Sequence, residues 1–207
     1  LTGSGIRPVA ENISYVLAFM TRPGPGKAPE LWGQRFSFTD LLLPVVYRLR
    51  QEGESVVREK RMPVPAGYSL FGAFHADLNG NGTPENGFFN PGGRLVISES
   101  GAPVWQSNDR FAGSREVLLV HDPSGSDAAP QRLEIFAQPA LFLQNTRIAA
   151  AIALNRAGLT RMIGEGADEG TVGVLRFSRS AYQLQMLPDH FQGPVRHVCV
   201  WENELLI

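Results

Sequence analysis

Cysteine is almost absent from this sequence, because its 207 residues include only one, Cys199. A single thiol excludes an intrachain disulfide, a Cys-x-x-Cys-His haem attachment and a zinc cluster built from several cysteines. Cys199 lies within the apolar run VRHVCVW. We therefore expect it to be a buried, unreactive side chain.

Neither sign of charge is in excess, since 19 Lys and Arg stand against 20 Asp and Glu, for a net charge of −1. A surface for nucleic acid is therefore not expected. Long apolar runs are also missing, so we expect no membrane span in this chain. No signal peptide is visible and the first residue is not Met, which fits a processed or trimmed piece and leaves a removed leader open.

Catalytic motifs are missing as well. The sequence contains no Gly-x-Ser-x-Gly, no His-Glu-x-x-His and no Cys–His pairing, so no nucleophile or base is indicated and we do not expect an enzyme. Trp32, Trp105 and Trp201 could line a sugar-binding face. They occupy similar positions in the repeat described below, however, and packing explains them better.

Glycine and proline are plentiful, with 22 and 15 residues, and short runs rich in β-formers lie between them. This composition predicts an all-β sandwich, barrel or propeller. The length suits one compact domain over residues 1–207.

The most specific spacing is Asp77-Leu-Asn-Gly-Asn-Gly-Thr-Pro-Glu85, which we call the acidic loop. Side-chain oxygens at positions one, three and five, a glycine at six and a carboxylate at nine are typical of a calcium loop, because Ca²⁺ takes six to eight oxygen ligands. Gly82 permits the positive φ that the chain reversal needs. The predicted calcium ligands are Asp77, Asn79, Asn81, the Thr83 carbonyl and Glu85.

The acidic loop has two other possible interpretations. An EF-hand would need a Glu at position twelve and helices on both sides, whereas position twelve is Phe88 and the flanking sequences predict strands. A metal-free Asn-Gly turn would also satisfy the pattern. With only two charged ligands, we expect one weak site with a dissociation constant of about 10⁻⁴–10⁻³ M.

The run FGAFHADLNGNGTPENG resembles the FG-GAP/VCBS repeat of calcium-binding β-propellers, and GRLVISESGAPVWQSNDRFAGS resembles the rest of such a blade. The upstream ELWGQRF extends the similarity to VCBS-repeat proteins of bacterial cell envelopes. The resemblance covers about a quarter of the chain and implies a blade at residues 67–114. It also implies a periplasmic, envelope or extracellular location.

A second, degenerate copy is predicted at residues 145–187. Shifting the acidic loop by 76 positions aligns Leu154, Asn155 and Gly158 with matching residues, while Ala153 and Arg161 replace the first and ninth ligands. Such a copy would have lost its metal. The alternative for residues 147–158 is an Ala-rich helix that ends at Gly158.

These observations predict a β-propeller-like array of about four short antiparallel blades. It could be a small or incomplete propeller, part of a propeller completed by another chain, or an open array within an assembly. The predicted function is a calcium-binding module for protein–protein interaction, because unpaired edge strands of an incomplete array favour a protein partner or self-association. The alternatives are a structural subunit with a vestigial calcium loop and a carbohydrate-active or carbohydrate-binding propeller.

Overall fold

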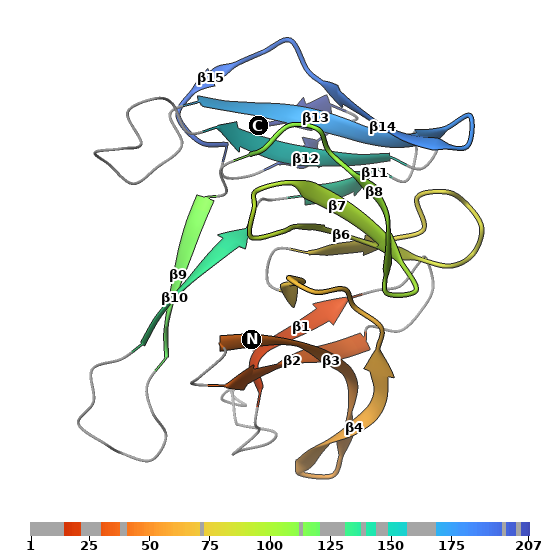
Figure 1. Cartoon of the computed structure of the whole chain (residues 1–207), viewed down its shortest axis with the longest axis vertical. Coiled ribbons are helices and arrows are strands. Elements are labelled where there is room, and N and C mark those ends of the chain that lie inside the picture. Colours follow the sequence, from red (N-terminus) through yellow and green to blue (C-terminus); the bar gives the residue numbers. More distant parts are fainter. Residues whose placement is uncertain are drawn as a thin grey trace.

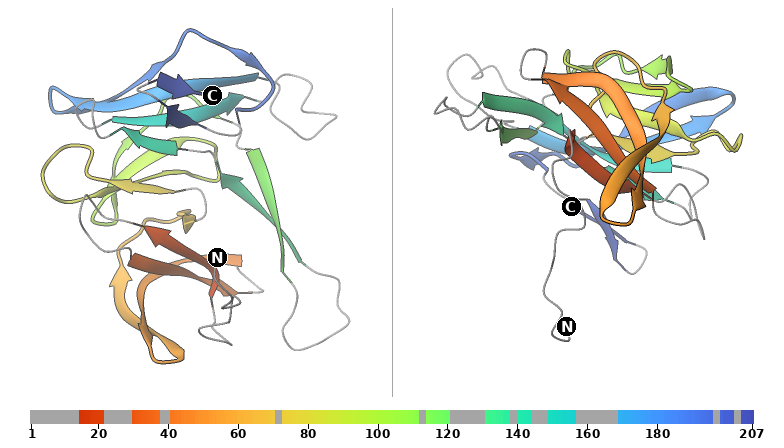
Figure 2. Two further views of the ribbon diagram at one scale, coloured as in Figure 1. Left: turned by 180° about the vertical axis from the view of Figure 1, so that it is seen from behind. Right: turned by 90° about the horizontal axis from the view of Figure 1, so that it is seen from below.

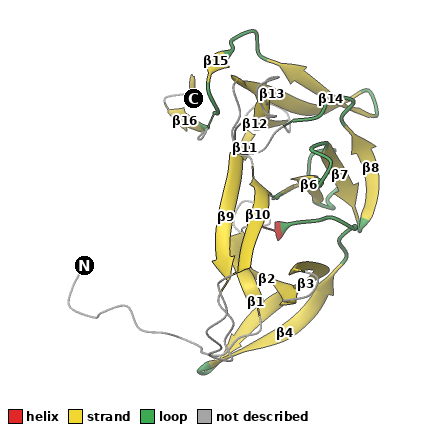
Figure 3. Ribbon diagram, turned by 60° about the vertical axis from the view of Figure 1, so that its left-hand side comes forward, coloured by secondary structure: helices red, strands yellow, loops and turns green. Residues whose placement is uncertain are grey.

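The computed structural model of the chain describes residues 15–21, 30–37, 41–70, 73–111, 114–120, 131–137, 140–143, 149–156, 169–195, 198–201 and 204–207. Within these ranges the fold is all-β, as predicted (Figure 1). Apart from a single 3₁₀ position at Leu70, the regular structure consists of strands and the turns between them (Figure 3).

Three antiparallel meanders of four strands make up most of the molecule. The first contains β1 (Tyr15–Thr21), β2 (Glu30–Ser37), β3 (Leu41–Glu52) and β4 (Ser55–Met62). The second contains β5 (Phe74–Ala76), β6 (Glu85–Phe89), β7 (Leu95–Glu99) and β8 (Ala102–Gln106). The third contains β11 (Ala140–Leu143), β12 (Ala149–Arg156), β13 (Glu169–Ser178) and β14 (Ala181–Met186).

Shorter elements complete the described structure. The short strand β15 (Phe191–Gln192) pairs with the beginning of β13. Strands β9 (Ser114–Val120) and β10 (Gln131–Ala137) form a separate hairpin that connects the second meander to the third. A last small hairpin pairs β16 (Cys199–Trp201) with β17 (Glu204–Leu206).

The three meanders lie one above another, with the β5–β8 sheet in the middle (Figures 1 and 2). Its two faces are both buried. Phe88 and Val96 join a core with Trp32 and Val46 of the β1–β4 sheet. Their neighbours along the strands join a second core with Ile152 of the β11–β14 sheet; these neighbours are Phe89, Leu95 and Ile97. Because successive side chains of a strand point to opposite faces, one run of apolar residues builds two interfaces.

A buried amide links the first sheet to the chain that enters the second. Gln34 is completely buried on β2. Its Nε2 donates to the carbonyl oxygens of Leu43 and Tyr68, each at 2.9 Å, and its Oε1 accepts from the Leu70 N–H at 2.8 Å. All three bonds go to the backbone, and the bond to Leu43 lies where the register between β2 and β3 shifts. This side chain therefore supplies hydrogen bonds that the ladder itself does not make there.

The outer face of the β11–β14 sheet is covered by the segment that follows it. Ala151, Ala153 and Val172 form a small core with Val195. The Asn155 side chain, also fully buried, accepts from the Val195 N–H at 2.7 Å and donates to the Val195 carbonyl at 3.1 Å. An amide side chain therefore imitates a strand partner and ties the chain near residue 195 to β12.

Residues 149–156 are a strand, so the helical alternative for this stretch is wrong; the remainder of 147–158 lies outside the described residues. Cys199 is exposed, contrary to expectation, because it lies in a two-stranded ribbon rather than within a covered sheet. Among the described residues the sheets form no closed barrel or propeller.

Candidate functional site: the acidic loop between β5 and β6

The acidic loop connects two strands of the middle sheet, as the sequence predicted from its flanks. β5 ends at Ala76, and β6 begins at Glu85, the last residue of the loop. Asp77 organises the turn: its Oδ1 accepts from the Gly80 N–H at 2.8 Å and its Oδ2 from the Gly82 N–H at 2.9 Å. Both glycines have positive φ, +74° and +85°, which a residue without Cβ adopts at little cost.

Two further side chains wind the loop in the same way. Asn79 Oδ1 accepts from the Asn81 N–H at 2.9 Å, and Asn81 Oδ1 accepts from the Thr83 N–H at 2.7 Å. These are Asx turns, in which an amide oxygen bonds the backbone two residues ahead. Each such oxygen has a second lone pair that the turn leaves unused. Thr83 is exposed and enters the network through its N–H.

Glu85 differs from the rest of the loop because it is completely buried. Its Oε2 accepts from the Leu78 N–H at 2.7 Å, and its Oε1 accepts from the Tyr182 hydroxyl at 2.7 Å. Burial raises the pKa of the Glu85 carboxyl, and these two hydrogen bonds oppose the rise by favouring the charged form. The closing carboxylate of the pattern is therefore held inside the protein at the junction of two sheets.

The structure adds two residues that the sequence pattern did not indicate. Glu99, at the end of β7, accepts with its Oε1 from Nδ2 of Asn79 at 3.3 Å and of Asn81 at 2.6 Å. Tyr182, on β14 of the neighbouring sheet, reaches Glu85, and its hydroxyl also accepts from Asn79 Nδ2 at 3.5 Å. Glu99 could have been found from the hairpin that follows the loop, whereas nothing local in the sequence indicates Tyr182.

Negative charge accumulates around the loop without a cationic partner in the described part of the chain. Glu99 raises the pKa of Glu85 through like-charge repulsion, in addition to burial. Burial and the neighbouring Glu85 also raise the pKa of Tyr182. With Glu85 and Glu99, Asp77 is the third carboxylate in or beside the loop. A bound cation would relieve this repulsion.

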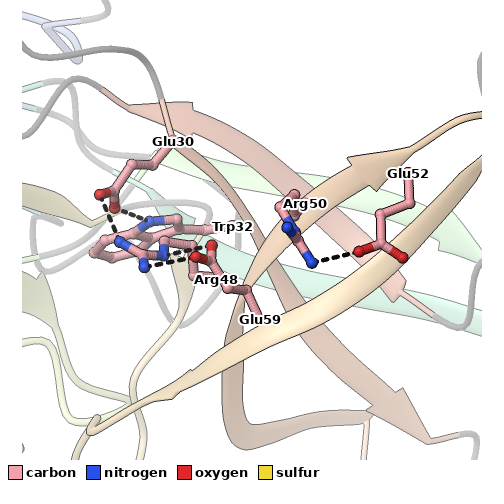
Figure 4. A network of polar contacts seen from close by, with 6 residues as sticks. All are labelled: Glu30, Trp32, Arg48, Arg50, Glu52 and Glu59. Atoms are coloured by element: carbon pink, nitrogen blue, oxygen red, sulfur yellow. Dashed lines mark hydrogen bonds and ion pairs between the residues drawn. The ribbon is translucent and has the colours of Figure 1, made fainter.

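The ion pairs of the described residues lie elsewhere, on the β1–β4 sheet (Figure 4). Arg48 contacts Glu30 at 3.1 Å and Glu59 at 2.8 Å, and Arg50 pairs with Glu52. The Trp32 indole N–H donates to Glu30 at 2.9 Å, so its ring is held in place at the edge of the core. These ion pairs use charges of the β1–β4 sheet alone, and none among the described residues reaches the acidic loop.

The donor set of the loop suits a hard cation, because all of its candidate ligands are oxygens. Within the described residues, no three His, Cys, Asp or Glu side chains gather closely enough to hold a metal by themselves. A cation here would therefore need the amide oxygens of Asn79 and Asn81 and a backbone carbonyl beside the two carboxylates of the loop. This is the mixed set that the sequence predicted.

The second copy of the loop does not form at the predicted alignment. Ala153, Leu154 and Asn155 would be loop positions one to three, but they lie within strand β12 and are buried. The Asn155 side chain bonds the backbone of Val195. The remaining positions, including Gly158 and Arg161, lie outside the described residues. Three matching letters were too few to distinguish a loop from an extended strand.

The tryptophans are not arranged as a sugar-binding platform where the structure describes them. Trp32 is only 1% exposed, packed in the core between the first two sheets. Trp105 on β8 is partly buried against the other interface, with its ring centroid 6.5 Å from that of Tyr182. The side chain of Trp201 lies outside the described part. Packing accounts for the two described rings.

No protein-family model matches this chain, and no curated protein matches it either. The similarity to FG-GAP/VCBS repeats therefore stays a prediction from the acidic loop and its flanks. Within the described ranges, no helix is long and apolar enough to cross a membrane.

Proposed function

We propose that this chain is a non-enzymatic, calcium-binding β-module of the propeller type. It would mediate protein–protein interaction or assembly at the cell envelope or outside the cell. The observation that carries the proposal is the acidic loop, in which three Asx side chains turn their oxygens toward successive backbone N–H groups beside uncompensated carboxylates.

Asp77, Asn79, Asn81, the Thr83 carbonyl and Glu85 would hold the ion. Calcium would supply positive charge to a loop that carries only negative charge, and it would make the connection between β5 and β6 more rigid. Two charged ligands within the loop imply weak binding, with a dissociation constant of about 10⁻⁴–10⁻³ M, as in extracellular modules. Such an affinity suits a compartment in which calcium is plentiful.

The four-stranded antiparallel meanders support the propeller part of the proposal. Blades of a propeller are sheets of this kind that pack face to face. The predicted unit at residues 67–114 contains β5–β8, and the predicted unit at 145–187 contains β12–β14. We infer that the chain is an incomplete or open array of blades.

Calcium binding is tested by a thermal melt in 10 mM CaCl₂ against the same protein in chelator. A ligand that binds only the folded state at ten to a hundred times its dissociation constant adds about 1.4–2.7 kcal/mol. For a chain of this size, we expect a rise in Tm of roughly 3–10 °C. The rise should vanish in Asp77→Ala and persist in Asp189→Ala, which removes an exposed aspartate outside the loop. Equal melts with and without calcium would contradict the proposal.

The structural subunit with a vestigial loop is the second candidate, and one observation favours it. The side chains of Asp77, Asn79, Asn81 and Glu85 already have hydrogen-bond partners without a cation. Both oxygens of buried Glu85 accept hydrogen bonds, from the Leu78 N–H and the Tyr182 hydroxyl. Such a loop could keep its shape after losing its metal. Calcium-independent stability together with a tight complex in a larger assembly would favour this candidate.

Exposed edges support a partner or self-association. Strands β4, β8 and β14 each pair on one side only within the described sheets, and unpaired edges template further strand pairing. On β8, Val104 is 49% exposed. We expect light scattering to give a mass above the 22.6 kDa monomer.

A lysine on the exposed edge should reduce self-association, so Val104→Lys is the informative variant. Gln51→Lys adds the same charge at an exposed position of the β3–β4 hairpin, on another sheet, and should leave the mass unchanged. A monodisperse wild-type monomer, with and without calcium, would show that self-association is wrong and would leave only a different protein as partner.

A further inference from the structure

Two of the proposed calcium ligands are neutral amides, and an amide side chain can face a loop in two ways. Turned one way, Asn79 and Asn81 present Oδ1, which can bind a cation. Turned by 180°, they present an NH₂ group, which repels one. The affinity of the loop therefore depends on what selects the orientation of these two side chains.

The hydrogen bonds of both amides select the same orientation. On the loop side, Asn79 Oδ1 and Asn81 Oδ1 accept from backbone N–H groups. On the opposite side, the Nδ2 atoms of both donate to Oε1 of Glu99, at 3.3 and 2.6 Å. Reversing either amide would place its NH₂ group against a backbone N–H and its oxygen against a carboxylate. Both new contacts would be repulsive, so the observed orientation of the two amides is strongly favoured.

Among the residues that the structure describes, Glu99 is the one group that accepts from both amides. The bond from Asn81 is short, as expected when the acceptor is charged. A negatively charged acceptor on the NH₂ group also polarises the amide so that its oxygen becomes more negative. A more negative oxygen is a better ligand for a cation. Groups behind a metal ligand commonly orient and polarise it in this way.

We propose that Glu99 is the positioning residue of the acidic loop: it turns the oxygens of Asn79 and Asn81 to the side where calcium binds. This inference rests on the proposed calcium-binding function. Glu99 lies at the end of β7, directly before the Ser100-Gly101 turn, and is only half-buried. Its replacement should therefore leave the fold intact.

The test is calorimetric titration of the purified full chain with Ca²⁺, in wild type, Glu99→Ala, Glu99→Gln and Glu54→Gln. Glu99→Ala removes the acceptor and should weaken calcium binding about 10- to 100-fold. Glu99→Gln keeps an acceptor oxygen and loses the charge, so we expect a loss clearly smaller than that of the alanine variant. Glu54→Gln removes the same charge from an exposed turn of the β1–β4 sheet and should bind within about twofold of wild type.

A second readout follows the amides themselves. In the metal-free wild-type chain, the side-chain NH₂ protons of Asn79 and Asn81 should exchange slowly with solvent in NMR spectra, and Glu99→Ala should make them exchange fast. A purely structural role for Glu99 would lower the Tm without changing the calcium affinity of the folded chain.

The outcomes separate this inference from the function on which it rests. Absence of calcium binding by wild type overturns the proposed function and, with it, the role of Glu99. Binding by wild type with unchanged affinity in Glu99→Ala overturns the role of Glu99 alone. Equal losses in Glu99→Gln and Glu99→Ala would mean that only the charge matters, which also overturns the orienting role.

Discussion

His75 shows how one side chain on the middle sheet depends on its surroundings. Its ring packs edge-on against Trp32, with centroids 4.6 Å apart, and its Nδ1 lies 2.9 Å from Asn86 Oδ1. Burial lowers the pKa of His75 from its usual 6.5, against smaller opposing effects of Asn86 and Glu30. The folded protein therefore favours neutral imidazole, with Nδ1–H donating to Asn86.

At this residue scale we predict acid sensitivity. Below pH 6.5 the unfolded chain takes up a proton that folded His75 resists, so stability falls as the pH drops from 6.5 toward the lower folded pKa. The contribution is at most about 1.4 kcal/mol per pH unit in that window. Urea unfolding at pH 7.5 and 5.5 should show a larger loss for wild type than for His75→Gln. His190→Gln, at an exposed histidine, should behave as wild type; equal losses in wild type and His75→Gln would contradict the prediction.

At the scale of elements, strand β14 is joined to the acidic loop through one hydroxyl. Tyr182 packs its ring beside Phe177, with centroids 4.9 Å apart, and extends its O–H to Glu85. This bond crosses from the β11–β14 sheet to the β5–β8 sheet. The state of the loop and the packing of the two sheets should therefore be coupled.

The variant Tyr182→Phe keeps the ring and removes only the O–H, leaving one oxygen of a buried carboxylate without that donor. We expect a loss of about 1.5–3 kcal/mol in the free energy of unfolding, the range for a hydrogen bond to a charged group. Hydrogen exchange should increase in β14 and in the acidic loop, with β2–β4 serving as the internal reference. An increase spread evenly over all sheets, or none, would argue against this coupling.

At the scale of the whole molecule, each sheet depends on the next for a covered face. The outer face of the β11–β14 sheet is covered by the segment around Val195, which both hydrogen bonds of Asn155 hold in place.

Asn155→Ala should leave two buried backbone groups of Val195 unpaired and lower the free energy of unfolding by about 2–4 kcal/mol. Limited proteolysis should then cut near residue 195 faster than in wild type. Asn108→Ala, at an exposed asparagine, is the matched control; an unchanged cleavage pattern in Asn155→Ala would contradict the role of this amide.

Local sequence patterns were sufficient to predict the strands and the acidic loop. Glycine, proline and short β-rich runs predicted an all-β chain, and most strands lie where these runs occur. The spacing from Asp77 to Glu85 predicted a loop between two strands, because Asx residues and glycines bond and bend the chain within a few positions. These features depend on neighbours in sequence, so they could be read before any tertiary contact was known.

Only the tertiary structure decided the rest. Asn155 matched a loop position in the sequence but became a buried strand residue, because pairing with β13 and the contact with Val195 outweigh a three-letter resemblance. Tyr182 reaches Glu85 across 97 positions, and Cys199 lies exposed in a two-stranded ribbon. The sequence by itself determined the strands and the oxygen-rich loop; burial and long-range hydrogen bonds, which depend on how sheets stack, decided which residues surround that loop.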